Sequence, residues 1–588
     1  MNPPQPHPFV AAKPNRAPVP AWCALLALVV IVIVAFSASV KFGFINYDDP
    51  HYITENPHVN TGLSPANLKW ALTSTGETNL WSPLTFLSHQ LDVSLFEFKP
   101  GWHHAVNVLW HALATALLFL SALKLTKSTF WSFFIGILWA IHPEKVQSVA
   151  WLSERKDVLS GAFFFASLYA FTWWKLRPEK RPELYVSSVL LFILALLAKP
   201  SVVPLPLILF LLYYLDTKRI HASVRDAALP LLPFVGAAFF VAGIAIYFQS
   251  QGSLGDVGEN LSLAQRASNI VVSYVFYLKR FFWPSPAQLW FVPPASIIPL
   301  IGSVAVICVL APVVFWLGKK DKLIIVGAAI YTLLWLPVSG LVPVSYYFVA
   351  DRYSYLPQLG LVFMLMGLVR LLSRNVTSLL PAGLVLGNFS VFFLILQQQQ
   401  LPLWKDSETL FGYEMAVNPK SLLAPIHYAD VFSDSDPEKA LFYYTKAHRN
   451  DPEAGIALAK MGVAQKQLGL HEEALESFHK STQVAVPVRE SWTQLLLLQV
   501  GLRLYAQAED TIQRGISSEP KNWDFIMNSG NFHLIVKKQP EVALKYFLMA
   551  HALQPADPRS IKACADCHRA LGNDSEARKF EELLGTGD

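Results

Sequence analysis

The sequence predicts an all-α protein, in which a polytopic bundle of transmembrane helices is followed by an array of helical repeats. Two observations support this fold class. Hydrophobic residues make up 53% of the 588 residues and charged residues only 15%, whereas a soluble protein carries about 25% charge. The apolar runs also lie between residues 20 and 398, while the chain from about residue 403 has the composition of an ordinary soluble domain.

The apolar part contains eleven segments that could cross a membrane, where a span needs about 20 apolar residues. They lie at roughly 21–40, 105–123, 128–141, 158–174, 184–198, 202–215, 227–248, 297–317, 323–342, 356–372 and 376–397. Several are short, which predicts a packed bundle with tilted or broken helices. A further segment, 270–283, contains Lys279 and Arg280, and we expect it to be interfacial or re-entrant.

The distribution of Lys and Arg predicts the orientation, because cytoplasmic loops carry the excess of basic residues. With residues 1–20 as a disordered cytoplasmic leader, the short basic loops all fall inside, provided that 270–283 does not cross. Their basic residues are Lys124, Lys127, Lys175, Arg177, Lys180, Arg181, Lys218, Arg219, Arg225, Lys319, Lys320, Lys322, Arg370 and Arg374. Eleven spans, over residues 21–398, then put the domain at 404–588 outside the membrane.

The predicted outer loops differ from the inner ones, since they are long, aromatic and carry both signs of charge. They are the loop at 41–102, "HPEKVQSVAWLSERKDV" at 142–158, and "SYYFVADRYSYLPQ" at 345–358. The residues capable of chemistry therefore gather on one side of the membrane. The net charge of +5 comes without a basic block, which argues against a nucleic-acid partner.

Residues 404–588 contain an internal repeat. "ALFYYTKAHRNDP" starts at Ala440, and related segments start at Ala474, Ala508 and Ala543, at steps of 34, 34 and 35 residues, with "ARKF" at Ala577. Each of the first four has a small residue, an apolar residue four later and a Pro 12 or 13 residues on. This resembles the second helix of the tetratricopeptide repeat, whose period is 34 residues. Such arrays present a concave surface to a protein partner.

The repeat region also contains "CADCH" at 564–568, which matches the spacing of haem c attachment. The register of the array places Cys564 and His568 at inward-facing positions of a first helix. We therefore predict that this motif is part of a packed core.

Two adjacent carboxylates, Asp48 and Asp49, follow the first span in "FINYDDPHYITENP". A carboxylate beside the membrane is costly unless it serves a function. It could act as a general base on an attacking hydroxyl, or the pair could hold a divalent cation such as Mg²⁺ or Mn²⁺ through oxygen ligands. The alternative is structural, because "NYDDP" is also good turn chemistry.

A second candidate group is "SERKDV", which stands directly before an apolar run. Arg155 offers a bidentate fork to a phosphate and Lys156 a point charge, with Glu154 and Asp157 as possible support. The alternative is that Ser153 caps a helix and that the acidic residues complement its dipole.

The third group is "ADRYSYLP", in which Arg352 is another phosphate candidate and Asp351 a possible support. The alternative is an Asp–Arg pair that anchors an interfacial aromatic belt. Lys199, near an outer helix junction, could add positive charge. Three histidines at helix ends fit no metal-binding motif, and we expect them to form hydrogen bonds: His103, His104 and His142.

The motifs "NYDDxxY", "HPxxVxSVAWxSERKDVL", "LPVSGLVPV…ADRYSYLP" and "WKDSETLF" occur in this order, followed by the repeats. The ordered set resembles the transmembrane-and-tetratricopeptide-repeat O-mannosyltransferases and their bacterial relatives. These belong to the polytopic GT-C glycosyltransferases, which take a sugar from a polyprenyl-phosphate donor. The resemblance covers about residues 20 to 580.

The resemblance implies a role for each group. An Asp of the first outer loop is catalytic in that class, so Asp48 becomes the expected base, with Asp49 positioning the acceptor or a cation. Arg155, Lys156 and Arg352 match motif positions expected to steady the donor phosphate. The implied reaction moves mannose or a similar hexose to an acceptor hydroxyl, with a protein Ser or Thr presented by the repeats. The expected location is a bacterial inner membrane with a periplasmic repeat domain, or alternatively the endoplasmic reticulum.

Two other functions compete with this interpretation. A membrane-anchored repeat scaffold would bind partners without catalysis, but it would need neither the Asp pair nor the outer basic residues. A transporter of lipid or sugar would favour charges in mid-membrane and inverted repeats. Neither feature is evident among the predicted spans.

Overall fold

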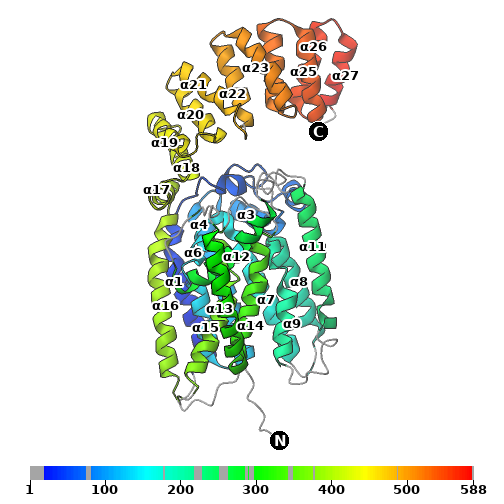
Figure 1. Cartoon of the computed structure of the whole chain (residues 1–588). Coiled ribbons are helices and arrows are strands. Elements are labelled where there is room, and N and C mark those ends of the chain that lie inside the picture. Colours follow the sequence, from blue (N-terminus) through cyan, green and yellow to red (C-terminus); the bar gives the residue numbers. More distant parts are fainter. Residues whose placement is uncertain are drawn as a thin grey trace. The chain divides into compact units, whose positions relative to one another are not determined.

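The computed structural model in Figure 1 describes residues 19–74, 81–176, 179, 181–216, 228–250, 262–284, 289, 297–341, 349–374, 376, 378–486 and 488–585. These ranges leave out most of the predicted leader and part of "LPVSGLVPV". They also leave out five residues of the predicted basic loops: Arg177, Lys180, Lys218, Arg219 and Arg225. The elements in the described ranges are all helical, which agrees with the predicted all-α class. The chain divides into two compact units, Met1–Tyr413 and Glu414–Asp588.

The first unit is a bundle of long helices with shorter helical turns between them (Figure 1). Its α-helices are α1 (Ala21–Phe36), α2 (Pro65–Thr73), α3 (Pro83–Phe96), α4 (Pro100–Thr126), α5 (Thr129–Ala140), α6 (Lys145–Ala150), α7 (Arg155–Leu176), α8 (Pro182–Ala198), α9 (Leu205–Asp216), α11 (Leu232–Ser250), α12 (Leu263–Phe282), α13 (Ile298–Lys320), α14 (Lys322–Trp335), α15 (Gln358–Leu372) and α16 (Leu380–Gln400). Helix α17 (Ser407–Val417) begins in this unit and ends in the second. The short turns that bear on the site are η1 (Ser37–Lys41), η2 (Pro50–Thr54), η4 (Leu152–Glu154), η5 (Pro200–Val202), η9 (Asp351–Ser354) and η10 (Leu401–Trp404).

Five described helical segments are long and apolar enough to cross a membrane: Ala21–Lys41, Pro100–Thr126, Leu229–Phe248, Ile298–Lys320 and Leu380–Trp404. The chain is therefore an integral, multi-pass membrane protein. Five shorter apolar helices accompany them: Thr129–Ala140, Pro182–Ala198, Pro200–Leu212, Lys322–Val338 and Gln358–Leu372. Each predicted segment coincides with a helix, but the count of eleven crossings stays a prediction.

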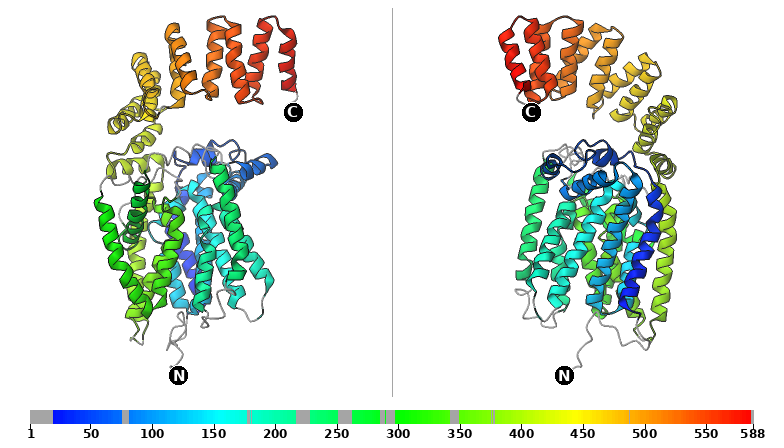
Figure 2. Two further views of the ribbon diagram at one scale, coloured as in Figure 1. Left: turned by 45° about the vertical axis from the view of Figure 1, so that its right-hand side comes forward. Right: turned by 180° about the vertical axis from the view of Figure 1, so that it is seen from behind.

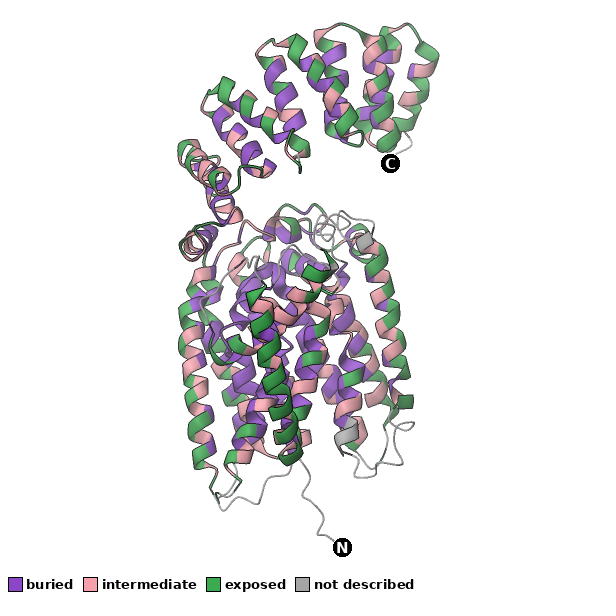
Figure 3. Cartoon of the chain, in the orientation of Figure 1, coloured by how far each residue is buried: buried purple, intermediate pink, exposed green. Residues whose placement is uncertain are grey.

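The outward faces of these helices are apolar, as a lipid-facing surface requires. Helix α13 is the clearest case, since Ser303 and Gly318 are its only buried residues in the described set. Its exposed side chains, which include Ile301, Val309 and Trp316, give it a mostly exposed surface in Figure 3.

Small residues let neighbouring helices touch inside the bundle. A Cβ atom added to Gly360 of α15 would lie 2.2 Å from the backbone nitrogen of Tyr331 in α14. Only glycine fits such a backbone-to-backbone approach, which is the usual way in which membrane helices pack closely.

The described residues of the loop at 41–102, which are 41–74 and 81–102, are folded and pack on the bundle. Its turns and helices η1, η2, α2 and α3 gather at one end of the first unit in Figure 2. Tyr52, Ile53, Val59 and Phe86 form a buried apolar cluster beneath them. This cluster gives the segment after the Asp pair a fixed platform.

The second unit is a row of antiparallel helical hairpins (Figure 2). Its elements are α18 (Leu423–Asp430), α19 (Pro437–Asn450), α20 (Gly455–Gln467), α21 (His471–Ser481), α22 (Arg489–Gly501), α23 (Tyr505–Ser518), α24 (Trp523–Asn531), η11 (Phe532–Val536), α25 (Pro540–Leu553), α26 (Pro558–Ala570) and α27 (Asp574–Gly585). The repeated small residues Ala440, Ala474, Ala508 and Ala543 are fully buried in the second helices. A Cβ on Gly462 would lie 2.7 Å from the Phe478 ring, which shows why small residues recur where the paired helices meet.

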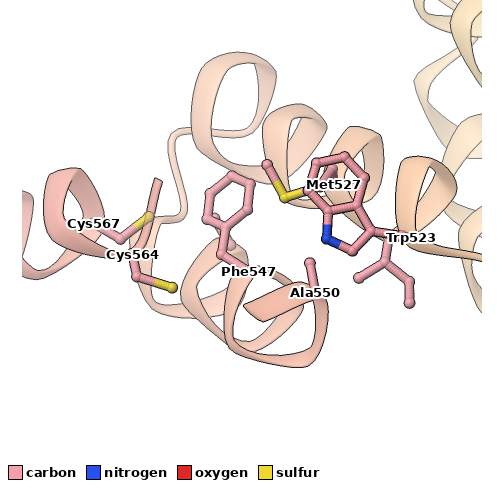
Figure 4. Close-up of a cluster of buried hydrophobic side chains, with 8 residues drawn as sticks. Trp523, Met527, Phe547, Ala550, Cys564 and Cys567 are labelled. Atoms are coloured by element: carbon pink, nitrogen blue, oxygen red, sulfur yellow. The ribbon is translucent and has the colours of Figure 1, made fainter. Parts of the chain in front are cut away.

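The "CADCH" motif lies in a packed core, as predicted. Cys564 and Cys567 are both fully buried, in a cluster with Trp523, Met527 and Phe547 (Figure 4). One detail of the prediction was wrong: the inward-facing pair is Cys564 and Cys567. His568 is instead half-buried and stacks on Phe580, because positions three apart share the inner face of this helix.

Candidate active site

The Asp pair lies on a loop that the last bundle segment holds in place. The backbone nitrogen of Gly43 donates to the Lys405 carbonyl at 2.9 Å, and that of Asn46 donates to Ser407 Oγ at 2.9 Å. Residues about 360 positions apart in the chain are thereby joined. The "NYDD" and "WKDSETLF" motifs therefore form one local structure.

Asp49 anchors the other side of this loop. One carboxylate oxygen accepts from the Ile45 backbone nitrogen at 2.8 Å. The other accepts from Ser153 twice, from its backbone nitrogen at 3.1 Å and its hydroxyl at 2.5 Å. Burial raises the pKa of Asp49 to about 6, so the carboxylate is ionised at pH 7. Asp49 joins the loop to η4, and its carboxylate is fully buried, away from any substrate.

Asp48 has the opposite environment. Its side chain is half-buried, and no hydrogen bond or ion pair holds its carboxylate within the described ranges. Burial raises the pKa of Asp48, while the charges of Lys156 and Arg352 act in the opposite direction. A free carboxylate with a raised pKa beside two cations is suited to accept a proton.

The cations gather around Glu154. Its carboxylate lies 3.1 Å from Lys156 Nζ, 3.1 Å from Arg352 Nε and 3.8 Å from Lys199 Nζ. Burial alone would raise the pKa of Glu154, but Lys156, Lys199 and Arg352 lower it to about 2. One buried carboxylate thus holds three positive groups together, and each of them keeps a partly exposed side chain, from 8% to 16%.

Aromatic side chains fix these cations in position. Lys156 Nζ lies 4.7 Å from the centre of the Tyr52 ring, which belongs to the platform below the loop. Arg352 lies over the Trp151 ring at 5.5 Å, and its backbone nitrogen donates to Gln147 Oε1 at 2.8 Å. Tyr47, next to Asp48, stacks on Trp151 from the loop side at 5.4 Å.

Asp157 supports the cluster from below. It accepts from Lys199 at 2.5 Å and from Ser148 Oγ at 2.9 Å. Lys199 therefore has two acidic neighbours, Asp157 and Glu154, which places its charge within the cluster although it comes from the end of α8.

The structure does not bring Arg155 into this cluster. Its guanidinium is fully buried and turns towards α3 and α4. It contacts Asp92, and it donates to Asn107 Oδ1 at 2.7 Å and to the His103 carbonyl at 2.8 Å. Although "SERKDV" predicted two neighbouring phosphate ligands, adjacent residues at a helix start point in different directions.

Asp351 and His142 belong to a second buried network. Arg280 of α12 lies 2.5 Å from Glu144 and 2.9 Å from Asp351. His142 Nε2 faces the Phe281 carbonyl at 3.2 Å, in agreement with the predicted hydrogen-bonding role. Sequence reasoning did not identify Glu144, although it stands in the quoted "HPEK" motif.

The network continues through Lys145, which is also buried and for which the sequence predicted no role. Its Nζ donates to Gln358 Oε1 at 2.5 Å and to the Tyr355 carbonyl at 2.7 Å. Together these contacts fix η9, and therefore Arg352, on the bundle.

Asp48 and Asp49 do not form a built metal site. Both Asp49 oxygens accept hydrogen bonds, and no third carboxylate or imidazole joins the pair in a metal-binding group within the described part of the chain. The Mg²⁺ or Mn²⁺ that the pair could hold by its residue types has no ligand set among the described residues, so no chemical step below passes through a metal at this place.

No protein-family model matches the chain. Among curated proteins, the protein O-mannosyl-transferase TMTC3 of Homo sapiens is 22% identical over 503 residues, which cover 77% of this chain and 54% of that protein. TMTC1 of Homo sapiens is 23% identical over 481 residues, covering 71% of this chain and 54% of the relative. The chain is a distant homologue of the TMTC protein O-mannosyl-transferases.

Shorter alignments to TMTC proteins reach higher identity. Tmtc1 of Drosophila melanogaster is 32% identical over 190 residues, which cover 31% of this chain and 21% of the relative. The chain thus spans about half the length, or less, of the TMTC relatives it matches.

Solved structures match a smaller part of the chain. The TPR protein YrrB covers 29% of this chain and 89% of its own, at 19% identity and a TM-score of 0.24. MamA covers 28% of this chain and 90% of its own, at 19% identity and a TM-score of 0.25.

Proposed function

We propose that the chain is a membrane glycosyltransferase that moves mannose or a similar hexose from a polyprenyl-phosphate donor to an acceptor hydroxyl. The observation that supports this most directly is the unpaired carboxylate of Asp48 beside Lys156 and Arg352. A hydroxyl nucleophile needs a base, and a departing phosphate needs positive charge. The base comes from the loop after η1, and the positive charge comes from the start of α7 and from η9.

In the proposed reaction, the acceptor oxygen attacks C1 of the sugar. The bond between C1 and the donor phosphate oxygen breaks, and its electron pair leaves with the polyprenyl phosphate. Asp48 takes the proton of the acceptor hydroxyl. Lys156, Lys199 and Arg352 stabilise the negative charge that grows on the phosphate, an effect that is strong where water is excluded. Arg155 and Asp49 act as positioning residues in this scheme.

Glu154 forms ion pairs with Lys156 and Arg352 in the absence of a donor. Its carboxylate already keeps Lys156 and Arg352 at 3.1 Å, so a phosphate can enter a preformed cationic site. Preorganised charge of this kind costs no reorganisation during the reaction.

The repeat domain supplies the second part of the proposal. We assign to it the presentation of a protein acceptor, whose Ser or Thr hydroxyl would be modified on the extracytoplasmic side. The homology to TMTC proteins and the hairpin array support this assignment.

The test uses the purified full chain in detergent with a panel of radiolabelled polyprenyl-phosphate hexoses. Released polyprenyl phosphate is measured with an acceptor extract, for the wild type and for Asp48→Asn and Lys156→Gln. We expect Asp48→Asn to lose most of the turnover, since one general base contributes about 10²–10⁴-fold. Lys156→Gln should lower it as well.

Lys405→Gln is the matched control, because this exposed lysine forms an ion pair with Asp406 and lies outside the cluster around Glu154. It should keep full turnover. Unchanged turnover in Asp48→Asn would contradict the assigned base. Transfer that occurs without any polyprenyl-phosphate donor would contradict the donor class. If no hexose donor in the panel is consumed with a full acceptor extract, while labelled partners bind the repeats, a scaffold role is favoured.

A further inference from the structure

Three metal-binding side chains meet in the first outer loop, outside the cluster around Glu154. His89 and Asp92 are three residues apart on α3 and share one face of it, and His103 stands near the start of α4. One ligand atom of each lies within 4.8 Å of the others. All three side chains are buried, with exposures of 0%, 3% and 0%.

The hydrogen bond of His103 fixes which ring nitrogen is bare. Its Nε2 lies 2.8 Å from the Glu97 carbonyl oxygen, which can only accept, so Nε2 carries the proton. In the neutral ring, Nδ1 then presents a lone pair, and it stands 3.6 Å from Asp92 Oδ2. Arg155 already contacts this Asp92 oxygen, whereas the lone pair of His103 Nδ1 faces no donor among the described residues and is available to a metal ion.

The backbone is shaped for this contact. Glu97 has φ 56° and ψ −142°, a region that favours glycine and is strained for any other residue. This conformation turns its carbonyl towards His103. A metal-bound histidine usually donates its second nitrogen to such a carbonyl, which fixes the ring for its ligand.

His89 provides the independent indication. Both of its ring nitrogens are buried and lack a hydrogen-bond partner within the described ranges. Leaving a buried polar group without a hydrogen-bond partner is unfavourable for folding. A metal ion that accepts the imidazole lone pair would satisfy one of these two nitrogens.

Arg155 is placed to orient the carboxylate. Its guanidinium contacts Asp92 Oδ2, the oxygen that faces His103, and is itself held by Asn107 and the His103 carbonyl. The other Asp92 oxygen is left for a metal ion, and carboxylates that bind metals are commonly fixed by such outer hydrogen bonds. Its positive charge also opposes a cation, so we expect a lower affinity than that of a zinc site with four protein ligands.

We propose that His89, Asp92 and His103 bind one divalent metal ion, with Zn²⁺ as the best match. Two imidazoles and one carboxylate, with a water in the fourth position, are a common ligand set for Zn²⁺. Mg²⁺ and Ca²⁺ prefer oxygen ligands throughout. The ion would join α3 to α4. Through Asp92 and Arg155 it would also hold the start of α7, which carries Lys156. It is a structural site and takes no part in the sugar transfer.

The test uses the full chain in detergent, stripped with a chelator and then titrated with Zn²⁺ and, separately, with Co²⁺. Metal content is measured by mass spectrometry after desalting, and Co²⁺ by its visible absorption bands. We expect about one ion per wild-type chain. His89→Gln and His103→Gln should each weaken Zn²⁺ binding at least ~100-fold, beyond the 10–100-fold typical of losing only an outer partner.

His104→Gln is the matched control, because this neighbouring buried histidine faces the Gly43 carbonyl and stands outside the group. It should keep one Zn²⁺ per chain. A wild-type chain that takes up neither ion, or full binding in both His89→Gln and His103→Gln, would overturn the proposal.

If these variants do not fold, X-ray absorption of the wild-type Zn²⁺ form decides instead. Two imidazole nitrogens at about 2.0–2.1 Å support the site, and a shell of oxygens alone overturns it. None of these readouts depends on sugar transfer, so failure of the metal site and failure of the glycosyltransferase proposal can be told apart.

Discussion

Asp48 and Asp49 are neighbours whose surroundings predict different mutant phenotypes. The oxygens of Asp49 accept from Ile45 and Ser153. In Asp49→Asn an amide group replaces one of these oxygens and leaves at least one buried donor unsatisfied, at a cost of about 1–3 kcal/mol. We expect thermal unfolding in detergent to shift to lower temperature. Asp48→Asn is the control and should unfold like the wild type, whereas an equal loss in both variants would contradict the separate roles.

The pH dependence of turnover tests Asp48 itself. Burial raises its pKa, and a base must be deprotonated to act. Turnover should therefore fall on the acidic side at a higher pH than for an ordinary aspartate, whose pKa is about 3.9. Lys156 lowers the pKa of Asp48, so Lys156→Gln should move the acidic limb of the remaining activity to still higher pH.

The control for that shift is Lys41→Gln, since Lys41 is exposed near the same loop. Its profile of kcat/KM against pH should match that of the wild type. An acidic limb that stays in place in Lys156→Gln would show that another group sets it.

At the residue scale, the sequence predicted which motifs matter better than it predicted what each side chain does. Adjacency in "SERKDV" suggested a shared role for Arg155 and Lys156, but the helix turns one towards α3 and the other towards Tyr52. Asp92, which partners Arg155, lies 63 residues away. Pairings over such distances leave no local pattern. The group of His89, Asp92 and His103 is close in sequence, but its side chains meet only because α3 and α4 pack together.

At the scale of elements, the helices were predictable because apolar runs and a repeat of 34 residues are local signals. The role of α12 could not be predicted from such local signals. Its segment carries Lys279 and Arg280 side by side, and their sequence suggests an interfacial helix. Only the fold shows that Arg280 turns inward to Glu144 and Asp351, while Lys279 is exposed.

This difference gives a prediction for α12. Arg280→Gln leaves two buried carboxylates without their cation, and breaking a buried pair costs about 3–5 kcal/mol. We expect a large loss of thermal stability in detergent. Because Asp351 precedes Arg352 in η9, turnover should also fall. Lys279→Gln is the matched control on the next residue and should change neither stability nor turnover.

Arg280→Lys separates charge from geometry in the same place. A lysine keeps the charge but cannot reach both carboxylates with a planar fork, so only part of the stability should return. Full recovery would show that charge alone holds η9, and stability unchanged in Arg280→Gln would contradict the network.

At the scale of the whole molecule, the number of membrane crossings decides on which side of the membrane each end of the chain lies. Five described helical segments are long enough to span, and the basic loops predict eleven crossings in total. An odd number places the two ends of the chain on opposite sides of the membrane. The segment of α12 decides this orientation. If it crossed the membrane as a twelfth span, every later loop would be inverted and the C-terminus would lie in the cytoplasm.

Fusions of two reporters in a bacterial host settle the count. Alkaline phosphatase is active only outside the cytoplasm. Green fluorescent protein fluoresces only inside it, because it does not become fluorescent when it is exported through the general secretory route. We expect a fusion at the C-terminus to show phosphatase activity and no fluorescence. A fusion after Arg374, in a predicted cytoplasmic loop, should show the reverse. If both fusions report the opposite side, α12 crosses the membrane, and the repeats cannot present an acceptor to the face on which we place the sugar transfer.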